Sequence, residues 1–236
     1  MLHTFCYACP AIELCYNQNT AEGDNVNLAA RLPREFYARD TLDVARDLLG
    51  KRLVRLSDGV RLAGRITEVE AYIGEDDRAS HASPGPTARN APMYGPPGYT
   101  YVYLIYGMHH CLNVVTERAG VPAAVLIRAV EPLEGLEIIQ RRRGLHYPTP
   151  NLTCGPGRLC AALNIDRSLN ACDLCAPDAL LWIEDAATVP ETQIARSPRI
   201  GVRGDQAALE VRWRFYSKHS AWVSGPRAFN QRWGTE

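Results

Sequence analysis

Two glutamates stand two residues apart in the segment ITEVEAY, residues 66–72, whose β-branched and apolar residues are typical of a strand. Strand alternation places Glu68, Glu70 and Tyr72 on one face. Such a face is most often simply solvated. If it lines a pocket instead, one carboxylate can activate a water molecule and stabilise positive charge that develops on a sugar. The spacing does not decide which glutamate would do so.

A second segment joins two predicted strands, residues 99–106 and 109–115, through a turn at Tyr106-Gly107-Met108. Hairpin turns usually carry Asp, Asn, Gly or Ser, so large apolar side chains at this tip need an explanation. Either another part of the fold covers them, or they form a wedge that enters between stacked bases and fills the gap left by a flipped nucleotide. The residues alone leave both interpretations open.

Several isolated polar residues also need partners. Asn113 and Arg128 lie in otherwise apolar strands, where an unpaired polar group costs free energy. For Arg128 we expect a carboxylate, because a buried guanidinium pairs well with that group. His81 lies in a connection rich in glycine and proline, where a histidine is usually solvated. The segment 155–158, GPGR, opens a predicted helix and could hold a phosphate on its free N–H groups, although this motif is unspecific.

The elements that carry these residues mix helices and strands without strict β-α-β alternation, which predicts an α+β fold with a mostly antiparallel sheet. Asp40 is the expected N-cap of a helix that ends at Gly50. The other predicted helices cover residues 132–143 and 156–163, and the predicted strands cover residues 51–56, 60–72, 99–106, 109–115, 123–130 and 211–215. We expect residues 1–30 to be a poorly patterned extension and residues 31–236 to form a single domain.

The composition is that of an ordinary globular protein, with 46% hydrophobic and 22% charged residues among 236, which excludes wholesale disorder. No apolar run approaches the roughly 20 residues of a membrane span, and no signal-peptide pattern is present, so we expect a cytoplasmic protein. The 26 basic and 26 acidic residues balance, but residues 1–30 carry −3 and residues 161–210 carry −4, which leaves +7 on the rest. A basic face can therefore attract phosphates.

Eight cysteines include two C-x2-C pairs, Cys6/Cys9 and Cys172/Cys175. Together they could form a four-cysteine zinc site, but their separation is far outside the usual spacing of such sites. Reduced, mostly buried thiols are the simpler interpretation, and we expect neither a metal nor another cofactor. A zinc nucleobase deaminase is excluded, because that chemistry needs a His-x-Glu motif and no histidine here has glutamate two residues on.

From about residue 31 to residue 224, about four-fifths of the chain, the sequence resembles the alkyladenine (3-methyladenine) DNA glycosylase family, the mammalian-type family that also occurs in bacteria. The resemblance rests on six stretches: ARDLLGK, ITEVEAY, RNAPMYGPPGYTYVYLIYGMHHCLNVV, LIRAVEPLEGLE, CGPGRLCAAL and RFYSKHSAWVS. It implies one α+β domain with a curved, mostly antiparallel sheet, surrounding helices and a protruding β-hairpin that enters the minor groove of DNA.

The resemblance also implies roles for individual residues. Glu70 falls on the general base that activates the water attacking the deoxyribose C1′. Arg128 falls on the residue that helps to hold this water, together with the main chain near Ile200, and Tyr106 falls on the intercalating tyrosine. The implied base pocket consists of Tyr72, His81, Tyr103 and Asn113, and the implied contacts to the DNA backbone are Thr87, Arg89 and Arg158.

The activity implied by the resemblance is that of a monofunctional DNA glycosylase that flips and excises alkylated purines such as 3-methyladenine, with hypoxanthine and ethenoadenine as further candidate substrates. Its partner would be double-stranded DNA containing damaged purines, and we expect a monomer without membrane contacts. A lyase would need an amine nucleophile, and the two lysines lie outside the matched site residues. The alternative function is a non-catalytic module that binds damaged nucleic acid. The presence of both Glu70 and Arg128 favours the enzyme.

Overall fold

The strand that carries the two glutamates, β2 (Val60–Ile73), organises the sheet in this computed structural model. One edge of β2 pairs with β5 (Ala123–Glu134), and the other pairs first with β1 (Arg52–Ser57) and then with β8 (Arg214–Ser217), all antiparallel. The structure describes residues 31–234, so the predicted extension 1–30 lies outside the described residues. The position of β2 between three partners brings β5 and β8 to its two glutamates.

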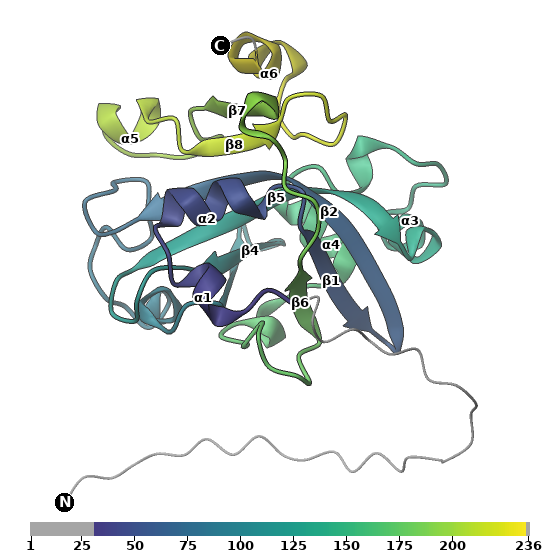
Figure 1. Ribbon diagram of the computed structural model, residues 1–236, viewed down its shortest axis with the longest axis horizontal. Helices are drawn as coiled ribbons and strands as arrows, with labels where there is room; N and C mark the ends of the chain where they lie inside the picture. The colour runs from purple at the N-terminus through teal and green to yellow at the C-terminus, as the bar shows by residue number, and fades with distance from the viewer. Residues whose placement is uncertain (1–30, 235–236) are drawn as a thin grey trace, which may run out of the picture.

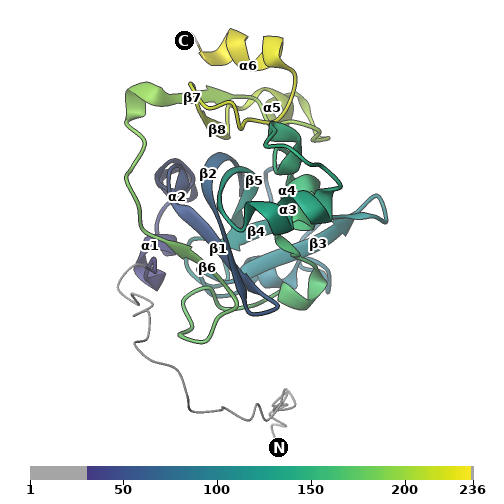
Figure 2. The same ribbon diagram turned by 90° about the vertical axis from the view of Figure 1, so that its right-hand side faces the viewer.

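Within residues 31–234 the sheet has eight strands: six follow the order β3-β4-β5-β2-β1-β6, β8 pairs with β2, and β7 pairs with β8. The remaining strands are β3 (Thr100–Ile105), β4 (His109–Val115), β6 (Leu181–Glu184) and β7 (Ile194–Ser197). The helices are α1 (Arg34–Tyr37), α2 (Thr41–Leu48), α3 (Leu136–Arg143), α4 (Pro156–Leu163), α5 (Gln206–Glu210) and α6 (Arg227–Gly234). Figures 1 and 2 show β7, β8, α5 and α6 as a layer on one side of the main sheet. This arrangement confirms the predicted α+β class.

The pairing of β2 with β5 is irregular where the glutamates lie. Its register shifts between Ile66 and Glu68 and again between Glu68 and Val69. A β-bulge of this kind bends the strand and increases its twist, and it can redirect side chains. The irregularity coincides with the point at which β8 replaces β1 as the partner of β2. The sheet is therefore deformed at the candidate site.

Helices α2 and α4 supply much of the apolar core. Asp40 caps α2 by accepting hydrogen bonds from the backbone N–H groups of the next turn, and the helix buries three apolar side chains, Val44, Ala45 and Leu48. Helix α4 buries four, Leu159, Cys160, Ala162 and Leu163. Burial of each valine or leucine side chain among them contributes about 1.5–3 kcal/mol. The core therefore supports the sheet that carries the site residues.

Local sequence signals predicted most of these elements correctly. The first hairpin turns at Asp58 and Gly59, whose φ angles are both positive, at 55° and 74°. A two-residue turn needs positive φ angles at these positions to match the twist of the two strands that it joins. The helix predicted from Pro132 is wrong at its start, because β5 continues to Glu134 and pairs Pro132 with Gly64 where the register is irregular. Helix α3 begins only after Gly135, which has a φ of 74°.

The C-terminal third was predicted less well. The strand expected at residues 211–215 lies at 214–217 instead. Strands β6 and β7 and helices α5 and α6 were not predicted, because they are short segments with little periodicity.

Within the described part of the chain, no helix is both long and apolar enough to cross a membrane.

Candidate active site

Glu70 is fully buried and is held by donors from three separate segments. Its Oε2 accepts from the Tyr72 hydroxyl at 2.9 Å and from Arg128 Nη1 at 3.1 Å, and its Oε1 accepts from the Ile200 N–H at 2.7 Å. The interpretation of this strand face as a solvated one is therefore wrong. A carboxylate has about four lone-pair positions, so three hydrogen bonds leave one position with which Glu70 can accept from a water molecule.

Glu68 lies behind Arg128 and is enclosed more completely. Its Oε1 accepts from Arg128 Nε at 2.9 Å, from Arg214 Nε at 2.7 Å and from the Ser224 hydroxyl at 2.8 Å, and its Oε2 accepts from the Ser224 N–H at 2.6 Å. Glu68 therefore accepts four hydrogen bonds, one more than Glu70, and none of its donors lines the cavity that opens beside Tyr72. Glu70 accepts from Tyr72, which does line this cavity, and this contact distinguishes the two carboxylates.

Arg128 contacts both carboxylates, which confirms the expectation that it pairs with a carboxylate. Its third nitrogen, Nη2, donates to the Ser224 hydroxyl at 3.1 Å. Burial lowers the pKa of Arg128, but the charges of Glu70 and Glu68 outweigh burial and raise it above its usual value. For Glu68 burial acts in the opposite direction and raises the pKa, but the charges of Arg128 and Arg214 outweigh burial and hold the pKa below its ordinary range. Two carboxylates and two guanidiniums thus form a buried row without net charge.

A cavity of about 290 Å³ opens beside Tyr72 and is bounded by aromatic rings. The ring centroids of His81 and Tyr103 lie 4.5 Å apart, and Tyr101 and Tyr103 lie 5.2 Å apart. Asn113 also lines this cavity. The structure therefore brings together all four predicted base-pocket residues. A slot between aromatic rings suits a planar base, because such rings stack on it.

His81 is tied into this pocket rather than solvated. Its Nδ1 lies 2.9 Å from the Tyr101 hydroxyl. Burial, followed by the charge of Arg89, lowers the pKa of His81, which favours the neutral ring at pH 7. When the Tyr101 hydroxyl donates to Nδ1, the proton of the neutral ring resides on Nε2. The pocket then offers a hydrogen-bond donor to an inserted base.

Tyr72 connects the base pocket to Glu70. Burial, and then the charge of Glu70, raises the pKa of Tyr72 well above its usual value, so the hydroxyl stays protonated and donates to the carboxylate. Behind the ring lies Arg199, 4.7 Å from its centroid, and Arg199 forms a fully buried ion pair with Asp77. This ion pair fastens the loop that contains His81 to the loop that contributes Ile200. Sequence reasoning missed Arg199, since nothing local distinguishes it from other arginines.

The other predicted site residues lie around the pocket. Asn113 donates through its side chain to the Tyr101 carbonyl at 2.9 Å, which leaves its side-chain oxygen available. The exposed Arg89 lies over the Tyr103 ring, 5.6 Å from its centroid. Thr87 is exposed and forms a small turn with Asn90. Arg158 lies apart, in the first turn of α4, and lines a second cavity together with Arg128.

The hairpin tip between β3 and β4 is uncovered. Tyr106 is 77% exposed and Met108 is 71% exposed, and Figure 2 shows the hairpin projecting from the body of the protein. The interpretation in which another part of the fold covers the tip is therefore wrong for the described residues. Tyr106 has a φ of 53°, a left-handed conformation that is uncommon for residues other than glycine. Solvent-exposed apolar side chains of this kind mark an interaction site.

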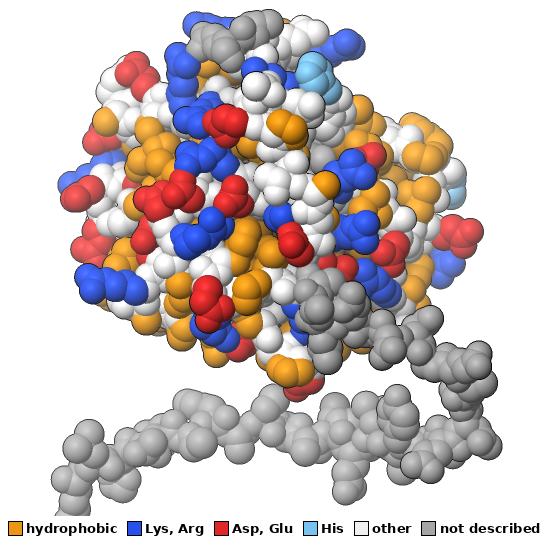
Figure 3. Space-filling model, viewed as in Figure 1, with side chains coloured by type: hydrophobic (Ala, Val, Ile, Leu, Met, Phe, Trp, Pro, Cys, Tyr) orange, Lys and Arg blue, Asp and Glu red, His pale blue; other side chains and the backbone are white. Residues whose placement is uncertain are grey.

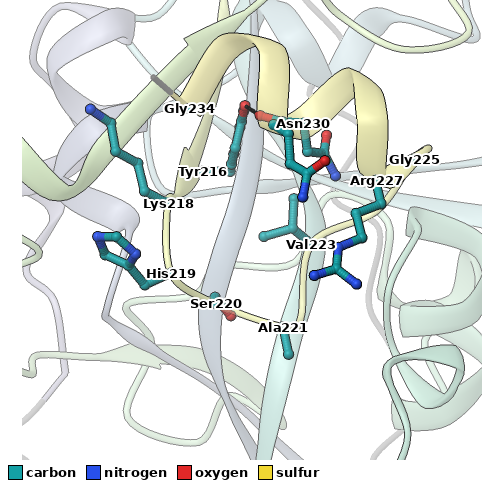
Figure 4. A pocket seen from close by; sticks show the side chains of 11 residues that line it. Tyr216, Lys218, His219, Ser220, Ala221, Val223, Gly225, Arg227, Asn230 and Gly234 are labelled. Atoms are coloured by element: carbon teal, nitrogen blue, oxygen red, sulfur yellow. Dashed lines mark hydrogen bonds between the residues drawn. The ribbon is translucent and has the colours of Figure 1, made fainter. Parts of the chain in front are cut away.

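The structure also contains a cavity of about 630 Å³ between β8 and α6, lined by Lys218, His219 and Arg227 among others (Figure 4). None of the predicted site residues lines it. Of the described residues only one tyrosine, Tyr216, lines it, and none of its lining residues donates to Glu70, whereas Tyr72 does so from the smaller cavity. The smaller cavity beside Tyr72 is therefore the candidate active site.

The cysteines in the described part of the chain do not form a metal site, since no three His, Cys, Asp or Glu side chains gather there. Burial is the main factor that raises the pKa values of Cys172 and Cys175, which disfavours reactive thiolates. Cys6 and Cys9 lie outside the described residues. The hypothesis of a zinc site that uses both pairs is thus untested.

A buried carboxylate beside an aromatic slot, with an exposed apolar hairpin tip nearby, is the arrangement needed by an enzyme that extrudes a nucleotide and acts on it. Comparison with known sequences defines the class further: residues 35–221 match the methylpurine-DNA glycosylase (MPG) family. The chain belongs to this family. It is a DNA glycosylase, a hydrolase of N-glycosidic bonds whose substrate is DNA.

Relatives from several prokaryotes support this assignment. The chain is 55% identical over 195 residues to a protein of Methanocella arvoryzae, covering 82% of this chain and 95% of that one. It is 54% identical over 199 residues to a protein of Anaeromyxobacter dehalogenans, covering 83% and 87%, and 47% identical over 205 residues to one of Alkaliphilus oremlandii, covering 82% and 98%. All three relatives bear the name "Putative 3-methyladenine DNA glycosylase".

Proposed function

We propose that the protein is a monofunctional glycosylase that flips alkylated purines out of double-stranded DNA and hydrolyses their bond to deoxyribose, leaving an abasic site. The observation that carries this proposal is the buried Glu70, held by three donors, one of which, Tyr72, lines the aromatic cavity. We further propose that it acts as a monomer in the cytoplasm, that it starts base excision repair and that residues 31–236 form the catalytic domain.

In the proposed reaction, a water molecule donates a hydrogen bond to Glu70 and attacks C1′ of the flipped nucleotide. The bond between C1′ and the base nitrogen breaks, its electron pair leaves with the base, and the water proton passes to Glu70. Glu70 also stabilises the positive charge that develops on the sugar. Arg128 keeps the carboxylate oriented through Nη1. A cationic base such as 3-methyladenine departs as a neutral molecule, so it needs no acid.

The aromatic cavity supports a preference for cationic lesions. A cation held against the rings of Tyr72, His81 and Tyr103 gains roughly 0.5–2 kcal/mol from cation–π attraction. Neutral bases such as hypoxanthine and ethenoadenine lack this gain and need a proton on departure, so we expect slower release. Asn113, which lines the same cavity, would exclude bases with an additional exocyclic group.

Binding to DNA would combine a wedge with contacts to phosphates. Tyr106 would occupy the gap left by the flipped nucleotide, because it is exposed at the end of a hairpin. Thr87, Arg89 and Arg158, all exposed, would contact the backbone. Flipping costs a few kcal/mol and costs less at a poorly paired lesion, which contributes to selection of damage.

Strand cleavage is not part of the proposal, because the two lysines are unsuited to act as nucleophiles in this pocket. The Nζ of Lys51 is paired with Asp185 at 2.6 Å, and Lys51 does not line the aromatic cavity. Lys218 lines the separate cavity beside α6. The reaction should therefore stop at the abasic site.

The decisive test is single-turnover release of 3-methyladenine from methylated duplex DNA in the presence of EDTA. We expect free base and an intact strand that breaks only on treatment with hot alkali. Tight binding to the damaged duplex without release would favour the non-catalytic binding module. Activity that EDTA abolishes would instead point to a metal and to the cysteine pairs.

A further inference from the structure

The backbone N–H that donates to Glu70 Oε1 belongs to Ile200, which lies in an irregular segment, residues 198–205. This segment joins β7 to α5 in the layer beside the main sheet (Figure 1). A donor in an irregular segment keeps a precise position only where neighbouring side chains fix the chain. The residue that precedes Ile200 in the chain, Arg199, makes contacts of this kind.

Arg199 ties its own segment to three other parts of the fold. Its Nη1 donates to Asp77 Oδ2 at 2.6 Å and to the Ala71 carbonyl at 3.1 Å. Its Nη2 donates to Asp77 Oδ1 at 2.7 Å and to the Ala208 carbonyl at 3.1 Å. Each Nη carries two hydrogens, so these four bonds use all of them. The acceptors belong to β2, to the loop that follows β2 and to α5.

The guanidinium of Arg199 also lies against aromatic rings. Its Cζ is 4.7 Å from the ring centroid of Tyr72 and 5.3 Å from that of Trp213. The Tyr72 hydroxyl is itself a donor to Glu70. Of the three donors to Glu70, one therefore packs on Arg199 and another, the Ile200 N–H, follows it directly in the chain.

Asp77 connects Arg199 to the aromatic cavity. Its Oδ1 also accepts from the Ala79 N–H at 3.1 Å, and its carbonyl accepts from the Ser80 N–H at 2.8 Å. Ala79 and Ser80 line the cavity, and so do residues 201–203 of the segment that contains Arg199. The ion pair thus joins two loops that both line the cavity.

The Arg199–Asp77 pair is enclosed rather than solvated. Figure 3 shows basic and acidic side chains interspersed on one face of the protein, where water competes for their hydrogen bonds. The side chains of Arg199 and Asp77 are only 0% and 1% exposed. A bidentate pair of this kind has a defined geometry. It can therefore hold a loop with the precision that a donor in an active site needs.

We propose that Arg199 is a positioning residue for base release, with Asp77 as its anchor. The pair keeps two donors, the Ile200 N–H and the Tyr72 hydroxyl, on the Glu70 carboxylate. Because its side chain is buried, Arg199 acts through Glu70 and not on the DNA. The inference rests on the proposed function, in which Glu70 takes the water proton. A displacement of about 1 Å can lower a rate about 100-fold, so loss of the pair should slow base release about 10- to 100-fold.

The variants are chosen so that no buried charge is left without its partner. Replacing one member of the pair alone would leave the other charged and buried, which is strongly destabilising. The double variant Asp77→Asn/Arg199→Gln removes both charges and keeps polar side chains. Arg61→Gln/Glu184→Gln is the matched control, because Arg61 also holds a carboxylate through both Nη groups, at 2.9 and 2.8 Å. Neither Arg61 nor Glu184 lines the aromatic cavity.

The assay is single-turnover release of 3-methyladenine from methylated duplex DNA over a range of enzyme concentrations, corrected for release without enzyme. For Asp77→Asn/Arg199→Gln we expect the maximal rate to fall about 10- to 100-fold. The enzyme concentration that gives half the maximal rate should change much less, and the control should match the wild type. A urea midpoint for each variant shows that it is folded.

The same substitutions are then made together with Glu70→Gln. If Arg199 acts through Glu70, they should lower the rate of Glu70→Gln far less than that of the wild type, since residues that act as a unit are not additive. Equal losses in the two backgrounds would show a general structural role and overturn the proposal. A double variant that is folded and as fast as the wild type would overturn it too.

Two further arms complete the test. If Asp77→Asn/Arg199→Gln does not fold, Arg199→Lys takes its place in the same comparison, because a single ammonium keeps the charge but cannot replace the planar fork. A wild-type protein that releases no base, or a Glu70→Gln variant that releases it at the wild-type rate, would contradict the proposed function itself. Failure of the positioning role is therefore distinguishable from failure of that function.

Discussion

Replacement of Glu70 by glutamine tests the proposed chemistry most directly, and its structural cost follows from the contacts. The carboxylate accepts from Tyr72, Arg128 and the Ile200 N–H. Glutamine has a single acceptor oxygen, so its amide group must face at least one of these donors. The Tyr72 hydroxyl can rotate to accept, but Arg128 and Ile200 cannot. Loss of one hydrogen bond to a charged group costs about 1.5–3 kcal/mol of unfolding free energy.

This loss is smaller than the 5–15 kcal/mol by which a typical domain is stable, so the variant should remain folded. The loss in rate should be much larger, roughly 10²–10⁴-fold in base release, because the group that takes the water proton is gone. Binding to damaged DNA should survive, since the aromatic walls and the hairpin tip are unchanged. The assay is single-turnover release of 3-methyladenine with enzyme in excess, accompanied by urea unfolding.

Tyr72→Phe is the matched control, because it removes one donor to Glu70 while keeping the aromatic ring. Its rate should fall less than that of Glu70→Gln. A folded Glu70→Gln protein that releases base within about 10-fold of the wild-type rate would refute the assignment of Glu70 as the general base.

Three further predictions follow from the same contacts. Tyr106→Ala should reduce the preference for damaged over undamaged duplex by at least about 5-fold, since stacking contributes roughly 1–3 kcal/mol; equal preference would assign the wedge to another side chain. The pKa of Glu68 lies below its ordinary value, so its stabilising effect is present above about pH 4.3 and is lost as pH falls through the lower folded-state pKa. Glu68→Gln should therefore be less stable at pH 7 by about 3–5 kcal/mol, as expected for a broken buried ion pair, and the difference in urea unfolding should shrink on acidification. Gly64→Ala should cost about 1–3 kcal/mol, because its new Cβ would lie 2.7 Å from Val130 Cγ2; an unchanged melting temperature would show that the sheet adjusts there.

The sequence was most informative where a local pattern dictates a local structure. The N-cap at Asp40, the positive-φ turn at Asp58 and Gly59, and the glycine-rich start of α4 each act within a few residues, so the elements around them were predicted closely. The approximate start of β5 was predicted for the same reason. Its end was not, because pairing with β2 carries the strand past Pro132.

Side-chain types also determined that Arg128 needs a carboxylate, because burying an unpaired guanidinium is costly. Strand alternation placed Glu68 and Glu70 on one face but could not separate their roles. That distinction comes from contacts of the folded chain: Arg214 and Ser224, more than a hundred positions away, enclose Glu68, whereas Glu70 accepts from Tyr72, which lines the aromatic cavity. Hydrogen bonds between segments so distant in sequence exist only after the sheet has formed, and so only the tertiary structure decides which carboxylate is connected to the cavity.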